Sequence, residues 1–137
     1  MLKKLLYALL VLVVLVVAGG LIMYNMPAEN VASKSVDYTT TATELFAEYE
    51  ANEKAGNTKY IDKVIQVSGK IEDMETDAKG AKVVLIGGNE MGNGVLCTLD
   101  TSEESKAAQL KVGDEVTIKG RCTGMLMDVV LNKCTIQ

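Results

Sequence analysis

The three cysteines, Cys97, Cys122 and Cys134, are the residues best suited to covalent chemistry. None of them forms a Cys-x-x-Cys pair, so the spacing indicates neither a thioredoxin-type redox site nor a zinc knuckle. Cys122 and Cys134 are equidistant from Asp128, and a hairpin turning there would place them opposite each other, about 4.5–5.5 Å apart. Two interpretations remain open: a disulfide in an oxidising compartment, or two small buried side chains with reduced sulfurs.

Cys97 alternates with Val95 and Leu99 against Thr98 and Asp100. This period of two places Cys97 on the apolar side of a strand, so we expect a free thiol in the core. An exposed Cys97 would instead suit a thiol-linked sensor in the cell envelope.

A glycine- and asparagine-rich run extends from Gly87 to Gly94. A phosphate-binding loop needs Gly-Lys-Ser/Thr before a helix, whereas this run contains a glutamate and leads into an apolar strand. The run is therefore predicted to be a hairpin loop. The residues expected to contact a partner are Gly88, Asn89, Glu90, Met91 and Asn93.

Glu72, Asp73, Glu75 and Asp77 form an acidic cluster without the glycine and closing glutamate of an EF-hand. A solvated loop is the favoured interpretation, and weak calcium binding is the alternative. Histidine is absent from the chain, which excludes imidazole bases, histidine metal ligands and Ser-His-Asp triads. The sequence therefore predicts no catalytic, metal-binding or cofactor-binding residues and a protein that is not an enzyme.

The elements that position these residues are mostly strands. Thr41 and Glu44 have capping-box spacing, which predicts an amphipathic helix over 42–56. Apolar residues then recur with a period of two, and a second hydroxyl cap at Thr101 opens a helix through Leu110. The predicted strands are 64–71, 81–86, 94–99, 115–126 and 129–136. Glycines inside strands, at Gly69 and Gly120, favour a closed or nearly closed five-stranded barrel.

The N-terminus carries an uncharged run over residues 5–24, behind Lys3 and Lys4. Its 20 residues match a bilayer core as a helix, so residues 1–24 are predicted to be a transmembrane signal anchor. The flanking lysines favour a cytoplasmic N-terminus and an extracytoplasmic, periplasmic domain. A cleaved signal peptide, giving a secreted domain, is the alternative. Residues 25–40 contain the only proline and no apolar period, and are predicted to be a linker to a domain over 41–137.

The stretch from Glu44 to Ile136 resembles the tRNA-anticodon-binding-like OB-fold family. The residues that carry the resemblance are Tyr60, 63–71 (KVIQVSGKI), 116–124 (VTIKGRCTG) and 128–134 (DVVLNKC). The resemblance implies an OB barrel in bacterial proteins that are membrane-anchored or secreted and have no assigned role. It does not imply an activity, because the fold hosts many functions.

Nucleic-acid binding by an OB barrel needs aromatic side chains on the strands and a basic groove. No aromatic residue follows Tyr60, and residues 44–137 carry 10 Lys and one Arg against 16 Asp and Glu, a net charge of −5. We therefore expect a non-catalytic binding or scaffolding module with an envelope protein as its partner. Binding of an oligonucleotide or oligosaccharide is the alternative.

Overall fold

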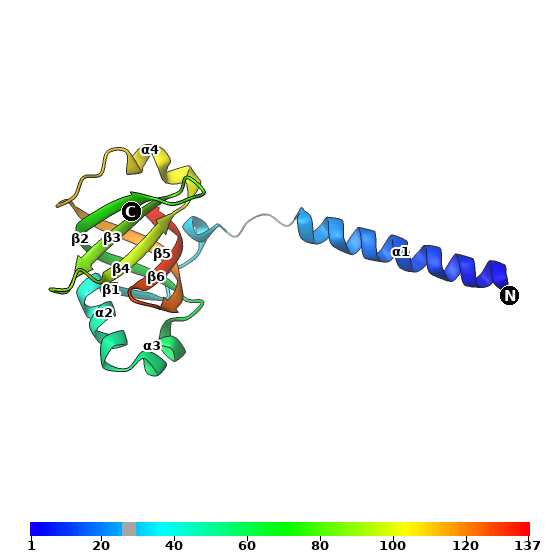
Figure 1. The fold of residues 1–137 in the computed structure, drawn as a ribbon, viewed down its shortest axis with the longest axis horizontal. Helices are drawn as coiled ribbons and strands as arrows, with labels where there is room; N and C mark the ends of the chain where they lie inside the picture. Colours follow the sequence, from blue (N-terminus) through cyan, green and yellow to red (C-terminus); the bar gives the residue numbers. More distant parts are fainter. Residues whose placement is uncertain (26–29) are drawn as a thin grey trace.

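The computed structural model describes residues 1–25 and 30–137, which form a long N-terminal helix and a small β-barrel (Figure 1). The helix α1 spans Leu2–Tyr24, and none of its residues is buried against the rest of the described chain. Its 23 residues are long and apolar enough to cross a membrane. The predicted membrane-spanning helix is therefore present as a candidate span.

Five strands close the barrel, as the sequence predicts. They are β2 (Val64–Thr76), β3 (Lys82–Gly88), β4 (Gly94–Leu99), β5 (Glu115–Met125) and β6 (Val129–Ile136). Neighbours around the barrel run β2-β3-β4-β6-β5 and return to β2; all pairs are antiparallel except β4 and β6, which are parallel. Between β4 and β5 lie a 3-10 turn, η2 (Thr101–Glu103), and a short helix, α4 (Glu104–Ala107), so the helix there is shorter than predicted.

Inward-facing aliphatic side chains fill the barrel. Ile65, Val67 and Ile71 of β2 are buried, as are Val84 and Ile86 of β3. They alternate with more exposed residues because successive side chains of a strand point to opposite faces of a sheet. The three cysteines are also fully buried in this core.

The predicted helix over 42–56 is two helices, α2 (Ala42–Ala51) and α3 (Glu53–Tyr60). Asn52 separates them: its backbone is extended, and its side-chain oxygen accepts a hydrogen bond from Ala55 N at 3.1 Å, which caps α3. The break lets Gly56 pack under the ring of Tyr49, where a Cβ would lie 2.8 Å from a ring atom. As the capping-box spacing predicts, the Thr41 side chain accepts a hydrogen bond from Glu44 N at 3.2 Å.

Within the predicted linker, the chain packs against the barrel before residue 41, and residues 26–29 lie outside the described part. A 3-10 turn, η1 (Val31–Ser33), buries Val31, and the strand β1 (Tyr38–Thr41) pairs in parallel with β2. Lys119 is 6% exposed, and its ammonium donates to the carbonyl oxygens of Ala32, at 3.1 Å, and Lys34. We call residues 31–41 the strap; the pattern of the linker did not reveal these contacts.

The strap also places an aromatic residue in a strand. Tyr38 is in a strand, so the sequence inference that every strand follows residue 61 is wrong. Its ring packs edge-on against Tyr60, at 5.1 Å between centroids, and contacts the core. The aromatic side chain of β1 therefore packs with the core cluster instead of forming an exposed platform for bases.

We predict that Gly94→Ala destabilises the barrel by about 2 kcal/mol or more. A Cβ at Gly94 would overlap the carbonyl oxygen of Gly87 and lie 2.7 Å from that of Ile86. Both obstacles are backbone atoms of the paired strand and cannot rotate away. Urea denaturation measures the change in free energy of unfolding.

Gly88→Ala is the matched control, because Gly88 pairs with Gly94 across the same hairpin. A Cβ there meets no atom closer than 3.6 Å. Equal stability changes in the two variants would contradict the close approach of β3 and β4 at Gly94.

Candidate functional site

The outer face of β3, β4 and β6 carries a row of aliphatic side chains that do not belong to the core. Leu85 pairs with Leu96, and Leu96 pairs with Val130 on the next strand. Val83 lies two residues before Leu85, and so on the same face. All four side chains are half-buried, and none belongs to the core cluster or to the side chains packed against it. We call these four residues the aliphatic stripe.

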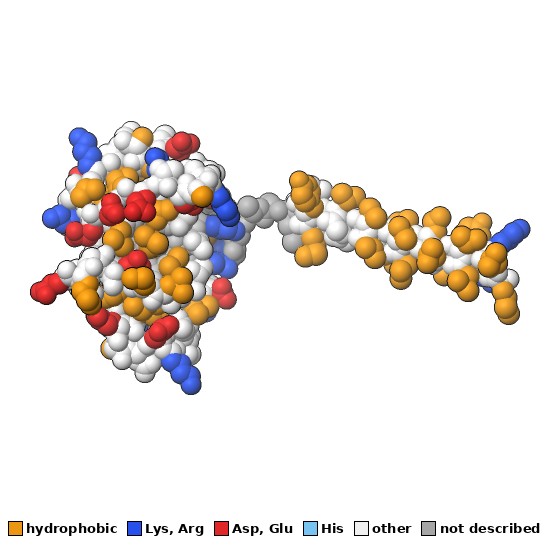
Figure 2. Space-filling model, in the orientation of Figure 1, with side chains coloured by type: hydrophobic (Ala, Val, Ile, Leu, Met, Phe, Trp, Pro, Cys, Tyr) orange, Lys and Arg blue, Asp and Glu red, His pale blue; other side chains and the backbone are white. Residues whose placement is uncertain are grey.

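Acidic side chains of β2 run beside this stripe. Asp73 pairs with Leu85, and Glu75 pairs with Val83. Paired residues on one face of a sheet lie about 5 Å apart at Cβ, so each carboxylate is next to an aliphatic side chain. Glu72 is exposed, and its Cγ lies near Gly88. We call Glu72, Asp73 and Glu75 the acidic border. Figure 2 views the molecule onto β3 and β4 and shows hydrophobic side chains at the centre of this face with acidic side chains beside them.

Two hairpin tips meet at one end of the outer face. Asp128, between β5 and β6, accepts a hydrogen bond from Gly94 N at 2.8 Å, which joins that loop to the loop between β3 and β4. Three large apolar side chains on these tips are strongly exposed: Met91 at 77%, Leu126 at 89% and Met127 at 72%. The loop expected to contact a partner, Gly88 to Asn93, is thus one of the two tips. The structure brings it next to a second exposed apolar loop.

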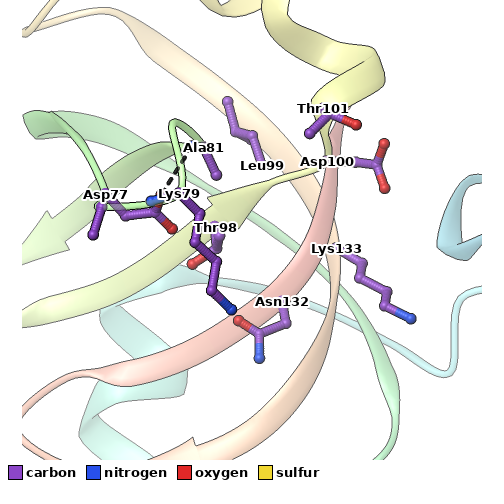
Figure 3. Close-up of a pocket in the computed structure, with 10 residues that line it drawn as sticks. Asp77, Lys79, Ala81, Thr98, Leu99, Asp100, Thr101, Asn132 and Lys133 are labelled. Carbon is purple, nitrogen blue, oxygen red and sulfur yellow. Dashed lines mark hydrogen bonds between the residues drawn. The ribbon is translucent and has the colours of Figure 1, made fainter. Parts of the chain in front are cut away.

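A groove of about 570 Å³ lies at the other end of the face, between the loop after β2, the end of β4 and the middle of β6 (Figure 3). Its polar lining residues are Asp77, Lys79, Thr98, Asp100, Thr101, Asn132 and Lys133. Figure 3 shows Lys79 pointing along the groove toward Asn132. None of the described residues that line the groove is aromatic.

Both carboxylates of the groove take part in local turns. Asp77 Oδ1 accepts hydrogen bonds from the backbone N–H groups of Lys79 and Ala81, each at 2.9 Å. Asp100 Oδ1 accepts from Ser102 N at 3.0 Å and Ser102 Oγ at 2.8 Å. These hydrogen bonds lower the pKa of Asp100 below its usual value, because they stabilise the charged form. The two carboxylates therefore hold the walls of the groove in place.

The cysteines lie under this face, with a register that differs from the predicted one. Cys122 pairs with Leu131, and Cys134 pairs with Leu99 of β4, so Cys122 and Cys134 are not opposed. Bulges near Gly120 and Thr123 shift the β5–β6 register, and Gly120 makes room for the Cys134 sulfur, which a Cβ there would approach to 2.5 Å. All three cysteines are free and buried in this structure.

Each thiol instead has a neighbour in the core. Burial is the main factor that raises the pKa of Cys134, and a hydrogen bond with Cys97 raises it further. Tyr49 Oη lies 3.4 Å from Cys122 Sγ, and burial followed by this contact raises the pKa of Tyr49. Cys97 is not exposed, so the condition that a thiol-linked sensor requires is not met here.

The site is suited to contact with another molecule. Across residues 1–25 and 30–137, no three His, Cys, Asp or Glu side chains gather in a way that could hold a metal ion. The outer face instead combines apolar area, carboxylates and a polar groove. In OB folds this surface, the second and third barrel strands with the loops beside it, is the usual ligand face.

The aliphatic stripe is not among the predicted site residues, although the sequence carries a signal for it. Residues 83–86 and 95–97 are continuous apolar runs in strands of an antiparallel hairpin. Such strands commonly alternate apolar and polar residues when their outer face is solvated. An unbroken run therefore indicates apolar side chains on both faces, one of them outside the barrel.

Comparison with known proteins agrees with this architecture. The sequence profile of the tRNA_anti-like family matches residues 1–136. The fold is similar to that of a Klebsiella pneumoniae protein described provisionally as a nucleic acid-binding lipoprotein, with a TM-score of 0.61 and 17% identity over 82% of this chain and 99% of that one. A chain of the S. pombe Stn1–ten1 complex matches at a TM-score of 0.41 and 16% identity, over 54% of this chain and 57% of that one. No curated protein matches the sequence.

We predict that Asp100→Ala lowers the free energy of unfolding by about 1 kcal/mol at pH 7, the usual cost of losing an N-terminal cap. The folded-state pKa of Asp100 lies below its ordinary value of 3.8, so its contribution is complete above that value and disappears as the pH falls through the lower folded-state pKa. Urea titrations of the native chain and the variant, at neutral and at strongly acidic pH, measure the stability difference where the contribution is complete and where it has disappeared. A stability difference that stays constant down to about pH 2 would contradict a charge-dependent cap.

Proposed function

This chain belongs to the tRNA_anti-like family, and we propose that it is a membrane-anchored, extracytoplasmic module that binds a protein and catalyses no reaction. The observation that carries the proposal is the outer face itself. Where an OB fold usually holds its ligand, this barrel presents the aliphatic stripe and the acidic border. Partly exposed apolar side chains that gather on one face in this way are typical of protein contact surfaces.

The same face is poorly suited to nucleic acid or sugar. Single-stranded nucleic acids bind by stacking on aromatic rings, worth about 1–3 kcal/mol per base, and by contacts of cations with phosphates. The rings of the barrel domain, Tyr38, Phe46, Tyr49 and Tyr60, pack in or against the core. Asp73 and Glu75 would repel phosphates from the strands. A ligand that needs neither stacking nor cations fits this surface better.

The anchoring part of the proposal is supported by α1 and by the cysteine positions. The first cysteine is Cys97, inside the barrel, so no cysteine follows the leader at which a lipid could be attached. Attachment therefore depends on α1, which is exposed along its whole length. Lys3 and Lys4 support a cytoplasmic N-terminus and, with it, a barrel on the outer side of the membrane.

We expect the full chain in phosphatidylcholine nanodiscs to show no saturable binding of single-stranded DNA or RNA at physiological salt. Fluorescence anisotropy with mixed oligonucleotides of about 20 residues is the measurement, since an OB fold covers about 4–16 nucleotides. Asp73→Lys/Glu75→Lys is the control, because added cations on this face should create weak, salt-sensitive binding. Low-micromolar or tighter binding by the native chain that persists at about 0.15 M salt would overturn the proposal in favour of an oligonucleotide-binding module.

The proposed orientation predicts that protease added to intact spheroplasts digests the barrel. Cytoplasmic domains stay protected until the membrane is lysed, which provides the internal control. Protection of the barrel until lysis would contradict the orientation. A mature N-terminus near residue 20 would instead contradict the retained anchor and indicate a secreted protein.

A further inference from the structure

The charge and polarity of the outer face identify the class of partner. Resting on the proposed function, we infer that the partner contributes a cationic, aliphatic protein segment that lies across the aliphatic stripe with its Lys or Arg side chains on the acidic border. Three observations support this: paired aliphatic side chains, carboxylates beside them that form no ion pair with a described residue, and exposed apolar tips at one end of the same face.

The aliphatic stripe provides the apolar part of the contact. Leu85, Leu96 and Val130 form one cross-strand row over three adjacent strands, and Val83 extends it along β3. Because these side chains point away from the core, burying them against a partner removes apolar area from water without disturbing the barrel. Aliphatic side chains match this stripe in shape and polarity, whereas the described aromatic rings of the barrel domain pack in or against the core and offer no platform for bases.

The carboxylates then select the charge of the partner. Among the described residues, no ion pair is formed by Glu72, Asp73 or Glu75. Lys82, which pairs with Thr76 at the end of β2, directs its ammonium to Thr76 Oγ1 at 2.9 Å. The border thus keeps its negative charge beside the apolar stripe, in a domain whose net charge is −5 from residue 44 on. A Lys or Arg of the partner would meet these carboxylates, whereas acidic segments and anionic lipids would be repelled.

The hairpin tips extend the contact. The Gly94–Asp128 hydrogen bond holds the two loops together at the end of the stripe, and Met91, Leu126 and Met127 are exposed on them. Methionine side chains adapt to irregular apolar surfaces, so the tips can close over a segment whose sequence is not fixed in detail. Glu90, on the same tip, adds another negative charge.

The test uses the full chain in phosphatidylcholine nanodiscs and three labelled peptides of equal length. The first alternates Lys with Leu and Val, the second replaces Lys by Glu, and the third replaces Leu and Val by Ser and Thr. Empty nanodiscs give the lipid background, which is subtracted from the anisotropy. We expect saturable binding of the Lys–Leu/Val peptide alone, weakening as salt is raised.

Two pairs of variants locate the binding. Asp73→Asn/Glu75→Gln should weaken it roughly two- to thirtyfold, the range for two exposed ion pairs. Glu50→Gln/Glu53→Gln removes the same charge from exposed positions on α2 and α3 and should leave it unchanged. Leu85→Gln/Leu96→Gln should also weaken binding, while Val112→Gln, an exposed apolar residue outside the face, should not. Circular dichroism confirms that each variant is folded.

Equal binding of the Glu or Ser/Thr peptide, or equal effects of the border and α2–α3 variants, would overturn the inference. A photo-crosslinking residue placed at position 96, used in cells, distinguishes failure of this inference from failure of the proposed function. One outcome is that position 96 crosslinks to one protein, that Leu85→Gln abolishes these crosslinks, and that no peptide binds. This outcome would refute a cationic partner segment but support the protein-binding function. Crosslinks to nucleic acid would refute both.

Discussion

The strand β2 determines most of this fold, because three other strands depend on it. Its first half pairs with β5 on one side and β1 on the other, and its second half pairs with β3. Gly69 lies where β1 gives way to β3, close to Ala42 and Gly87, so a side chain there would crowd the junction. Closing the barrel through β2 leaves none of its five strands with an open edge. The surface left for recognition is therefore the outer face and the loops.

Much of this architecture follows from local patterns in the chain. The period-two runs and interior glycines predict five strands in the right order, since each strand has an inner face that must be apolar. The bounds of β4 and β6 match the predicted ones, and β2 continues five residues further because its second half pairs with β3. The capping residue Thr41 also acts as predicted.

Features set by distant parts of the chain could not be predicted in this way. β1 consists of one tyrosine and three threonines, and it is a strand because β2 offers it a parallel partner. The opposition of Cys122 and Cys134 assumed a regular hairpin, whereas bulges shift the register of β5 against β6. The aliphatic stripe shows its role only once the barrel fixes which alternate residues point outward. Side-chain register is thus the part of the candidate site that needed the structure.

The fold and the surface carry separate information about this chain. The barrel and the family agree on an OB-like, binding type of domain. The ligand depends on which side chains occupy the outer face, and a family can keep one fold while those side chains change. Aliphatic and acidic residues at this face favour a different ligand from the one that the family name suggests.

In the membrane-anchored state that we propose, the strap limits how far the barrel can travel from the membrane. Val31 is buried on the barrel, and the Lys119 ammonium donates to the carbonyl oxygens of Ala32 and Lys34, so the chain is held on the barrel from Val31 onward. Seven peptide steps separate Tyr24 from Val31, which span at most about 25 Å. A barrel anchored in this way would meet membrane-bound molecules at an effective concentration of the order of millimolar. A surface with weak intrinsic affinity is then sufficient for a partner in the same membrane and insufficient for one that diffuses freely.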